Sequence, residues 1–194
     1  MVDPQEQLPN LTDEQQRLVA VSYLQSLANA ETSLLPNDVF LAVGKLVVLN
    51  TVEVAFVKPS NTDERDAQVL LTQRSNSDPL WANQWHIPGS IVRAKDPVKH
   101  EHDYDAAVSR IFKEVGGGIQ VVRDPFEYDV VRRKGQRSSE TTVRLMAESA
   151  GEPVNGAFFN AEAVLNKPPE GGLLESHAEA IEKLAKKYHD LKSN

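Results

Sequence analysis

The spacing of apolar residues predicts a helix at each end of the chain. Between residues 12 and 30 apolar side chains recur every three or four positions, as on one face of a helix. Thr12 and Gln15 have the capping-box spacing that begins such a helix. A second pattern of this kind, from Leu174 to Leu191, predicts a terminal amphipathic helix. Residues 1–10 are polar and contain two prolines, which is typical of a flexible lead.

Strand patterns fill most of the chain between these helices. Segments rich in β-branched and apolar residues predict strands at 52–57, 68–74, 119–133, 141–148 and 156–160. Asp124-Pro125 is expected to interrupt the third of them, and residues 38–49 fit either a short helix or a strand. One internal helix is predicted from about Asp103 to the glycines that begin at Gly116. This order lacks regular βα alternation and predicts an α+β layered fold.

Composition is that of an ordinary globular domain. The 194 residues suffice for one domain with a terminal extension, which we place at 38–194 and 1–37. No apolar run is long enough to span a bilayer, and the polar N-terminus does not resemble a signal peptide. The absence of cysteine excludes disulfides, thiolate nucleophiles and cysteine-based zinc sites. These features fit a cytoplasmic protein.

Net charge argues against two classes of partner. The chain carries a formal charge of −7, so its overall field does not attract nucleic acid or anionic membrane, and neither is expected as a partner. One basic run departs from this average, and it is either a solvated hairpin tip or a phosphate-contacting segment. It consists of Arg132, Arg133, Lys134 and Arg137.

The most informative motif joins a Pro-Gly turn to the internal helix. His86-Ile87-Pro88-Gly89-Ser90 precedes a helical pattern that ends in Glu114-Val115-Gly116. The motif resembles the Nudix box, G-x5-E-x7-R-E-U-x-E-E-x-G-U, where U is bulky and aliphatic. Aligning Glu114 and Gly116 with E-x-G puts Ile111 at the aliphatic position, Ser109 at the arginine and Glu101 at the first glutamate.

The resemblance extends beyond the box and implies a fold. The strand ending at Arg74, the Trp85 segment and the aromatic strand near Phe158 are similar to the corresponding parts of the family. Together they cover about residues 38–192. The resemblance implies a Nudix-type α/β/α sandwich with a mixed β-sheet, preceded here by an N-terminal helical extension.

The box departs from the family in charge and in spacing. Arg110 and Lys113 stand where the family has glutamates, so five positions that sum to −3 in the pattern sum to zero here. Ser90 replaces the second glycine of the turn. Ten residues rather than five separate it from Glu101, although Asp96 would preserve the shorter spacing as an alternative first acid.

The resemblance assigns roles to the box residues. Arg110, Lys113 and Glu114 share one helical face. Because the family's glutamates hold Mg²⁺ or Mn²⁺ against a pyrophosphate, Glu114 is the candidate metal ligand and catalytic residue; an ion pair with Arg110 is the alternative. Gly89, Glu101 and Gly116 are candidates for structural support of the box. Mg²⁺ or Mn²⁺ is the implied cofactor if the protein is an enzyme, and no cofactor is implied otherwise.

Other residues supplement this set. Glu140 is a candidate catalytic base, because some Nudix hydrolases take their base from outside the box. Arg74, Arg110 and Lys113 are candidates for binding phosphate, since guanidinium and ammonium groups hold phosphate oxygens directly. Further acids that could assist a metal site are Asp96, Asp103, Asp105 and Glu148. The His100-Glu101-His102 cluster lacks the ligand spacing of a zinc site.

Three functions are open on this basis. The first is a Nudix-type hydrolase acting on a nucleoside diphosphate linked to another moiety, with a degenerate metal site. The second is a catalytically inactive Nudix-like module that binds a nucleotide or a phosphorylated metabolite. The third is a homodimeric scaffold that uses the N-terminal helix.

Overall fold

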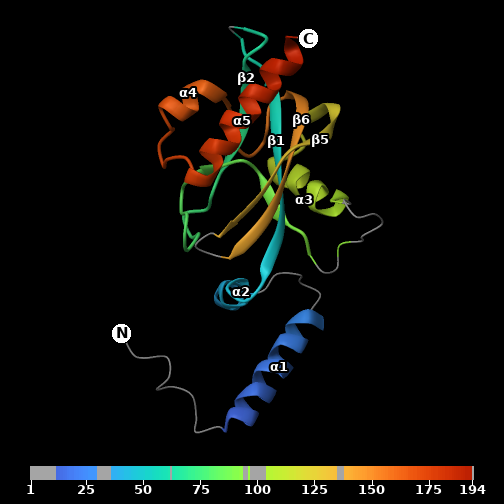
Figure 1. Ribbon diagram of the computed structural model, residues 1–194, viewed down its shortest axis with the longest axis vertical. Coiled ribbons are helices and arrows are strands. Elements are labelled where there is room, and N and C mark those ends of the chain that lie inside the picture. Colours follow the sequence, from blue (N-terminus) through green and yellow to red (C-terminus); the bar gives the residue numbers. More distant parts are fainter. Residues whose placement is uncertain are drawn as a thin grey trace. The chain divides into compact units, whose positions relative to one another are not determined.

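A computed structural model of the chain describes residues 12–29, 36–61, 63–93, 96, 104–134 and 138–193 (Figure 1). Contacts divide the chain into two compact units, Met1–Phe40 and Leu41–Asn194. The first unit contains the predicted N-terminal helix, α1 (Asp13–Asn29). Its first turn is a capping box, in which Thr12 N donates to Gln15 Oε1 over 2.9 Å and Gln15 N donates to Thr12 Oγ1 over 3.3 Å.

The remaining elements follow the predicted order. Helices and strands after α1 are α2 (Asn37–Gly44), β1 (Val48–Pro59), β2 (Ala67–Gln73), β3 (Trp85–His86), β4 (Gly89–Ile91), α3 (Asp105–Val115), β5 (Ile119–Lys134), β6 (Ser139–Gly151), β7 (Ala157–Asn160), α4 (Ala161–Asn166) and α5 (Glu175–Lys192). None of the helices within the described residues is long and apolar enough to cross a membrane.

The strands form one mixed sheet. Its central order is β3-β2-β1-β6-β5, with β4 also paired to β1 and β7 to β2. β1 and β6 run parallel, and the other paired strands run antiparallel. On the edge away from β6, β1 changes partner: residues 57–59 pair with β2, whereas residues 51–53 pair with β4. This change places Gly89 opposite Glu53, deep in the sheet.

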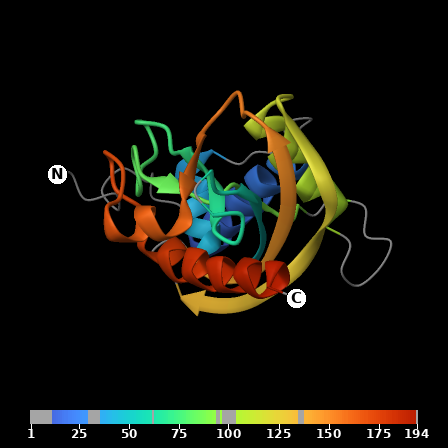
Figure 2. The same ribbon diagram turned by 90° about the horizontal axis from the view of Figure 1, so that it is seen from above.

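Apolar residues on alternate positions of β1 separate two cores. Val52, Val54 and Phe56 pack with α3. Ala55 and Val57 pack on the other face with α4 and α5. Figure 2 shows α5 and α3 separated by the strands. The predicted α/β/α sandwich with a mixed sheet is therefore confirmed.

Two local predictions need adjustment. Residues 38–49, which fitted a helix or a strand, contain both, because α2 ends at Gly44 and β1 begins at Val48. β5 also continues through Asp124-Pro125, where an interruption was expected. Register shifts flank this segment, and β5 lies at the sheet edge, where a proline need not donate to a neighbouring strand.

Candidate functional site

The box helix is anchored by one apolar stripe. Ala107, Ile111 and Val115 recur at four-residue spacing on α3 and are buried against the sheet. This leaves Lys113 exposed and Glu114 at the surface with its carboxyl partly buried. The aliphatic position of the motif therefore faces the core, while these two charged positions reach solvent.

Arg110 is held by the segment before the helix rather than by Glu114. Its Nη1 and Nη2 donate to the two carboxylate oxygens of Asp96 over 2.6 and 2.8 Å. Nη2 also donates to Ile91 O over 2.8 Å, and Nε donates to Ser90 Oγ over 3.2 Å. The hydrogen bonds from Arg110 to Asp96 hold the pKa of the Asp96 carboxyl below its ordinary value. The alternative ion pair between Arg110 and Glu114 is thus not formed, because Asp96 takes the guanidinium in a bidentate pair.

Losing this pair should weaken the attachment of the segment to α3. Arg110 and Asp96 side chains are only 23% and 11% exposed, so solvent screens them little. We expect Arg110→Ala to reduce the free energy of unfolding by about 1–3 kcal/mol, measured by urea denaturation. Arg65→Ala is the matched control, because Arg65 and Asp63 are 59% and 39% exposed, and its expected effect is below about 0.5 kcal/mol. Equal effects of the two substitutions would contradict this role.

Glu114 lies in a mixed electrostatic environment. Partial burial of its carboxyl raises the pKa above the ordinary value, and the charge of Arg74 opposes that rise. Its backbone oxygen accepts from Asn155 Nδ2 over 2.6 Å, which ties the end of α3 to the loop after β6. No ion pair joins Glu114 or Lys113 to another residue in the described part of the chain. Lys113 therefore presents its ammonium group to solvent.

The described donor set does not fit a divalent metal centre. No group of three or more His, Cys, Asp or Glu side chains gathers to hold an ion within the described residues. Hard cations such as Mg²⁺ prefer several oxygen ligands, whereas Glu114 stands beside Lys113 and within the field of Arg74. Several sequence candidates lie outside the described residues: Glu101, His100, His102, Asp103 and Arg137.

Gly89 and Gly116 occupy positions that leave little or no room for a side chain. A Cβ on Gly89 would lie 3.2 Å from both Glu53 Cγ and Val52 O, on the neighbouring strand. Gly116 has φ +84° at the end of α3, and a Cβ there would lie 2.5 Å from the Cβ of Val154. The two glycines permit the close contacts that place both ends of the motif.

Glu140 lies in a buried charge network on the opposite face of the sheet from α3. The centre of the network is Arg144 on β6, whose side chain is 1% exposed. It donates from Nε to Glu53 Oε2 over 2.9 Å and from Nη1 to Asp129 Oδ2 over 2.8 Å. Arg133 lies 3.3 Å from Glu53 Oε1 and 3.6 Å from Glu140 Oε2. The structure therefore does not bring Glu140 together with Glu114.

Two buried histidines adjoin this network. His177 is 3% exposed, because α5 packs its first turn on the sheet. Its Nδ1 accepts from Ile87 N over 3.1 Å, and its Nε2 lies 3.5 Å from Glu53 Oε1. His86 contacts Thr72 Oγ1 through Nε2 over 3.2 Å. Burial is the main cause that lowers the pKa of both, to about 3 for His86.

Sequence reasoning missed the network, although a signal existed. Glu53 interrupts the stripe that it shares with Ala55 and Val57, and Arg144 interrupts the stripe that it shares with Met146. A charged residue on the buried face of a predicted strand requires a partner. Two such residues of opposite charge, on strands far apart in sequence, could have been predicted to pair.

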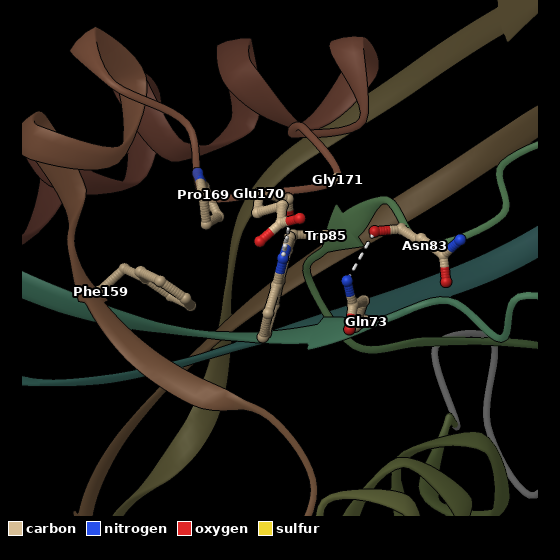
Figure 3. A pocket seen from close by; sticks show the side chains of 7 residues that line it. All are labelled: Gln73, Asn83, Trp85, Phe159, Pro169, Glu170 and Gly171. Carbon is tan, nitrogen blue, oxygen red and sulfur yellow. Dashed lines mark hydrogen bonds between the residues drawn. The ribbon is translucent and has the colours of Figure 1, made fainter.

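A pocket of about 660 Å³ lies beside β3 (Figure 3). Trp85 and Phe159 form its aromatic wall, with ring centroids 5.1 Å apart and planes at 73°. Trp85 Nε1 donates to Glu170 O over 2.9 Å, and Gln73 Nε2 donates to Asn83 O over 2.9 Å. The complete lining comprises Gln73, Asn83, Trp85, Phe159, Pro169, Glu170 and Gly171. These residues come from the ends of β2, β3 and β7 and from the loops between β2 and β3 and between α4 and α5.

Comparisons with solved structures identify the fold. The NUDIX domain of Shewanella oneidensis NrtR, in a cocrystal with ADP ribose, is 18% identical; the match covers 84% of this chain and 97% of that chain, with a TM-score of 0.53. A MutT NUDIX hydrolase from Burkholderia pseudomallei is 21% identical, covering 71% of this chain and 98% of its own, at a TM-score of 0.52.

A third structure and the sequence comparisons complete the result. A possible asymmetric diadenosine tetraphosphate hydrolase from Jonesia denitrificans is 14% identical, covers 75% of this chain and 97% of its own, and has a TM-score of 0.53. No protein-family model matches the chain, and no curated protein matches it in sequence. Over most of its length, the chain has the Nudix fold.

Proposed function

We propose that this chain is a Nudix-fold module that binds a nucleotide or another phosphorylated metabolite without metal-dependent hydrolysis. The observation that carries the proposal is the bidentate pair of Arg110 with Asp96. The pair places the guanidinium of Arg110 at a box position where the family has a carboxylate. It also engages the carboxylate of Asp96, in the segment before the helix. Among the described residues of the box, Glu114 by itself is a poor ligand set for Mg²⁺.

The charge around Glu114 suits an anion better than a cation. Lys113 is exposed on the same helix, and the charge of Arg74, which also pairs with Asp78, reaches the Glu114 carboxylate. An ammonium group binds phosphate oxygens as a point charge without a metal bridge. The ADP ribose bound by the NUDIX domain of NrtR supports a nucleoside diphosphate as the class of ligand. Arg110 is not included among the phosphate ligands, since Asp96 holds it.

Calorimetric titration with ADP ribose in EDTA tests the proposal. We expect binding without metal, and we expect Lys113→Glu to weaken it about five- to tenfold by reversing one charge near the phosphates. Lys187→Glu is the matched control, because it makes the same charge change on the exposed face of α5 and should leave the affinity unchanged. Binding that requires Mg²⁺ or Mn²⁺, or that ignores Lys113→Glu, would contradict a metal-free phosphate site.

Hydrolysis is the second candidate function, and one observation favours it. The pKa of Glu114 is raised by burial, and acids with perturbed pKa values gather at catalytic sites. The same protein is therefore incubated with nucleotide sugars, dinucleoside polyphosphates and either Mg²⁺ or Mn²⁺, and product release is followed. Metal-dependent turnover that Glu114→Gln abolishes would replace the binding module by a hydrolase.

A further inference from the structure

We propose that helix α1 of one copy of this chain packs on an uncovered part of the β-sheet of a second copy, so that two copies exchange their helices. The sheet surface lies where β1, β6 and β5 run side by side, on the face that carries α3 (Figure 1). We call it the basic sheet surface and define it by Val48, Val130, Arg132 and Lys134. It includes neither Lys113 nor Arg74, so the inference goes beyond the proposed phosphate site and does not depend on it.

Strand pairing places the members of this surface on one face of the sheet. Residues that pair directly on neighbouring strands share a face, and so do residues two apart on one strand. The three rows across β5, β6 and β1 are Val130 with Val143 and Val52, Arg132 with Thr141 and Asn50, and Lys134 with Ser139 and Val48. Because Val52 packs on the core beneath α3, all three rows face that side.

The side chains of these rows become exposed with distance from α3. Val52 and Val143 are 0% and 6% exposed, whereas Val48 and Val130 are 44% and 51% exposed. Arg132 and Lys134 are exposed as well. Exposed apolar side chains bordered by polar ones are typical of surfaces that contact another protein.

The surface is positively charged although the chain is acidic. The chain has a net charge of −7, yet the three rows contain two cations and no acid. The neighbouring acids Glu53, Asp129 and Glu140 belong to the charge network on the opposite face, and Arg133 lies there with them. The basic run of the sequence is thus divided between the two faces. A partner for the exposed half should combine apolar side chains with an acid.

Helix α1 has that combination, and its apolar side chains are exposed. Its acids, Asp13 and Glu14, lie in the first turn. No charged residue occurs from Leu18 to Asn29. Five large apolar side chains of this helix are between 43% and 60% exposed: Leu18, Val19, Val21, Tyr23 and Leu24. A helix with apolar residues on several sides is normally buried against other elements, so α1 is suited to a partner.

The spacing of residues on α1 matches that of the basic sheet surface. Glu14 and Leu18 share one face of the helix and lie about 6 Å apart along its axis. Arg132 and Val130 share one face of β5 and lie about 7 Å apart along the strand. A helix aligned with β5 therefore brings Glu14 to the cations while Leu18 packs on Val130. Arg17 lies about 60° around the helix from Glu14, at the margin of this contact.

A second copy is the occupant that these two surfaces favour. Every copy carries both the acidic, apolar helix and the basic sheet surface, so a twofold axis repeats the contact and closes the assembly. Repetition doubles the buried area, which brings two helix-sized contacts toward the roughly 1,200–2,000 Å² of a stable interface. The opposite charges also select the partner surface, which apolar contact alone does not do.

Light scattering and sedimentation equilibrium measure the assembly in solution. At about 100 μM we expect a dimer with a dissociation constant of about 1–10 μM. Its mass should be twice the 21.5 kDa of the chain. Arg132→Glu combined with Lys134→Glu should raise the dissociation constant at least about tenfold, because it sets acids against Glu14. Lys186→Glu combined with Lys187→Glu, at exposed positions on α5, is the matched control and should leave the constant unchanged.

Charge exchange tests whether α1 is the partner of the basic sheet surface. Adding Glu14→Lys to the doubly substituted sheet variant should restore the dissociation constant to within about threefold of the parent value, because the attraction returns with reversed sign. Glu162→Lys, at an exposed position on α4, makes the same change and should restore nothing. Circular dichroism spectra that match the parent protein show that each variant is folded.

Cross-linking between labelled and unlabelled copies tests whether the helix passes from one copy to the other. A carbodiimide joins a carboxylate to an ammonium group in direct contact, forming an amide with loss of water. In a mixture of nitrogen-15-labelled and unlabelled protein, we expect Lys134 to couple to Asp13 or Glu14 in peptides that join the two kinds of chain.

Four outcomes would overturn the inference. They are a monomer at the stated concentration, a dimer whose dissociation constant the sheet variant leaves unchanged, a sheet variant that Glu14→Lys does not restore, and coupling of Lys134 to α1 only within one chain. None of these outcomes bears on nucleotide binding, because Lys113 and Arg74 are unaltered in every variant.

Discussion

Arg144→Met is expected to reduce the free energy of unfolding by about 3–5 kcal/mol, because it leaves two carboxylates facing the core without their main partner. Arg144 is 1% exposed, and its partners Glu53 and Asp129 are 7% and 15% exposed. Methionine fills a similar volume, so the loss reports on charge rather than on a cavity. Equilibrium urea denaturation, with the midpoint and slope compared to the parent protein, measures the change.

Arg123→Met provides the control for this substitution. Arg123 also lies in the sheet and pairs with a glutamate, but its side chain is 55% exposed and the closest approach to Glu148 is 4.0 Å. We expect a change below about 1 kcal/mol there. Two other cations also contact these carboxylates: Arg133 lies 3.3 Å from Glu53, and Lys183 Nζ lies 3.3 Å from Asp129 Oδ2. A loss at Arg144 no larger than the loss at Arg123 would show that Arg133 and Lys183 satisfy the two carboxylates without it.

The order of helices and strands, together with the motif, was sufficient to predict the layers of this fold. β1 is buried without a break from Thr51 to Val57, because its two faces meet two different cores, and the stripe Ala107, Ile111, Val115 on α3 recurs every four residues. The motif around Gly89 and Gly116 then identified the family arrangement. Local patterns of this kind do not depend on the charged residues of the motif, so the fold can be recognised without them.

The contacts that define the candidate site join residues that are not neighbours in sequence. The pairing of Arg110 with Asp96 depends on where Asp96 lies after β4, which spacing alone left ambiguous. The pocket required two loops to meet at Gly171 and Asn83. Propensity does not encode either approach, because loop geometry is set by tertiary contacts. Sequence analysis therefore located the helix of the site but not the groups around it.

Acidification is expected to destabilise the protein well above the pH at which carboxylates titrate. Burial keeps His86 and His177 neutral in the folded chain, with the pKa of His86 lowered to about 3 and that of His177 well below the ordinary value. In the unfolded chain both take up a proton near pH 6.5. Below that pH the unfolded state binds more protons, so stability is full above about pH 6.5 and falls as the pH decreases.

The measurable quantity is the change in the free energy of unfolding per pH unit. Each histidine contributes up to about 1.4 kcal/mol per pH unit, and the window from about pH 6 to pH 5 separates them from aspartate and glutamate. His177 faces Glu53, which favours its charged form, and Arg133, Arg144 and Arg74, which oppose it; Glu140 acts with Glu53. Burial of the imidazole, with the opposing cations, keeps the pKa of His177 below its ordinary value.

His177→Asn isolates one of the two contributions. The Asn side-chain oxygen can accept from Ile87 N in place of His177 Nδ1, while the titrating group is removed. Urea denaturation at several pH values between pH 6 and pH 5 gives the free energy of unfolding as a function of pH. We expect this free energy to fall less steeply than in the parent protein, by up to about 1.4 kcal/mol per pH unit. His189→Asn, at an exposed position on the same helix, should leave the slope unchanged. If the pH dependence of the free energy of unfolding were unchanged in His177→Asn, His177 would be protonated in the folded protein. Burial and the surrounding cations would then not keep it neutral.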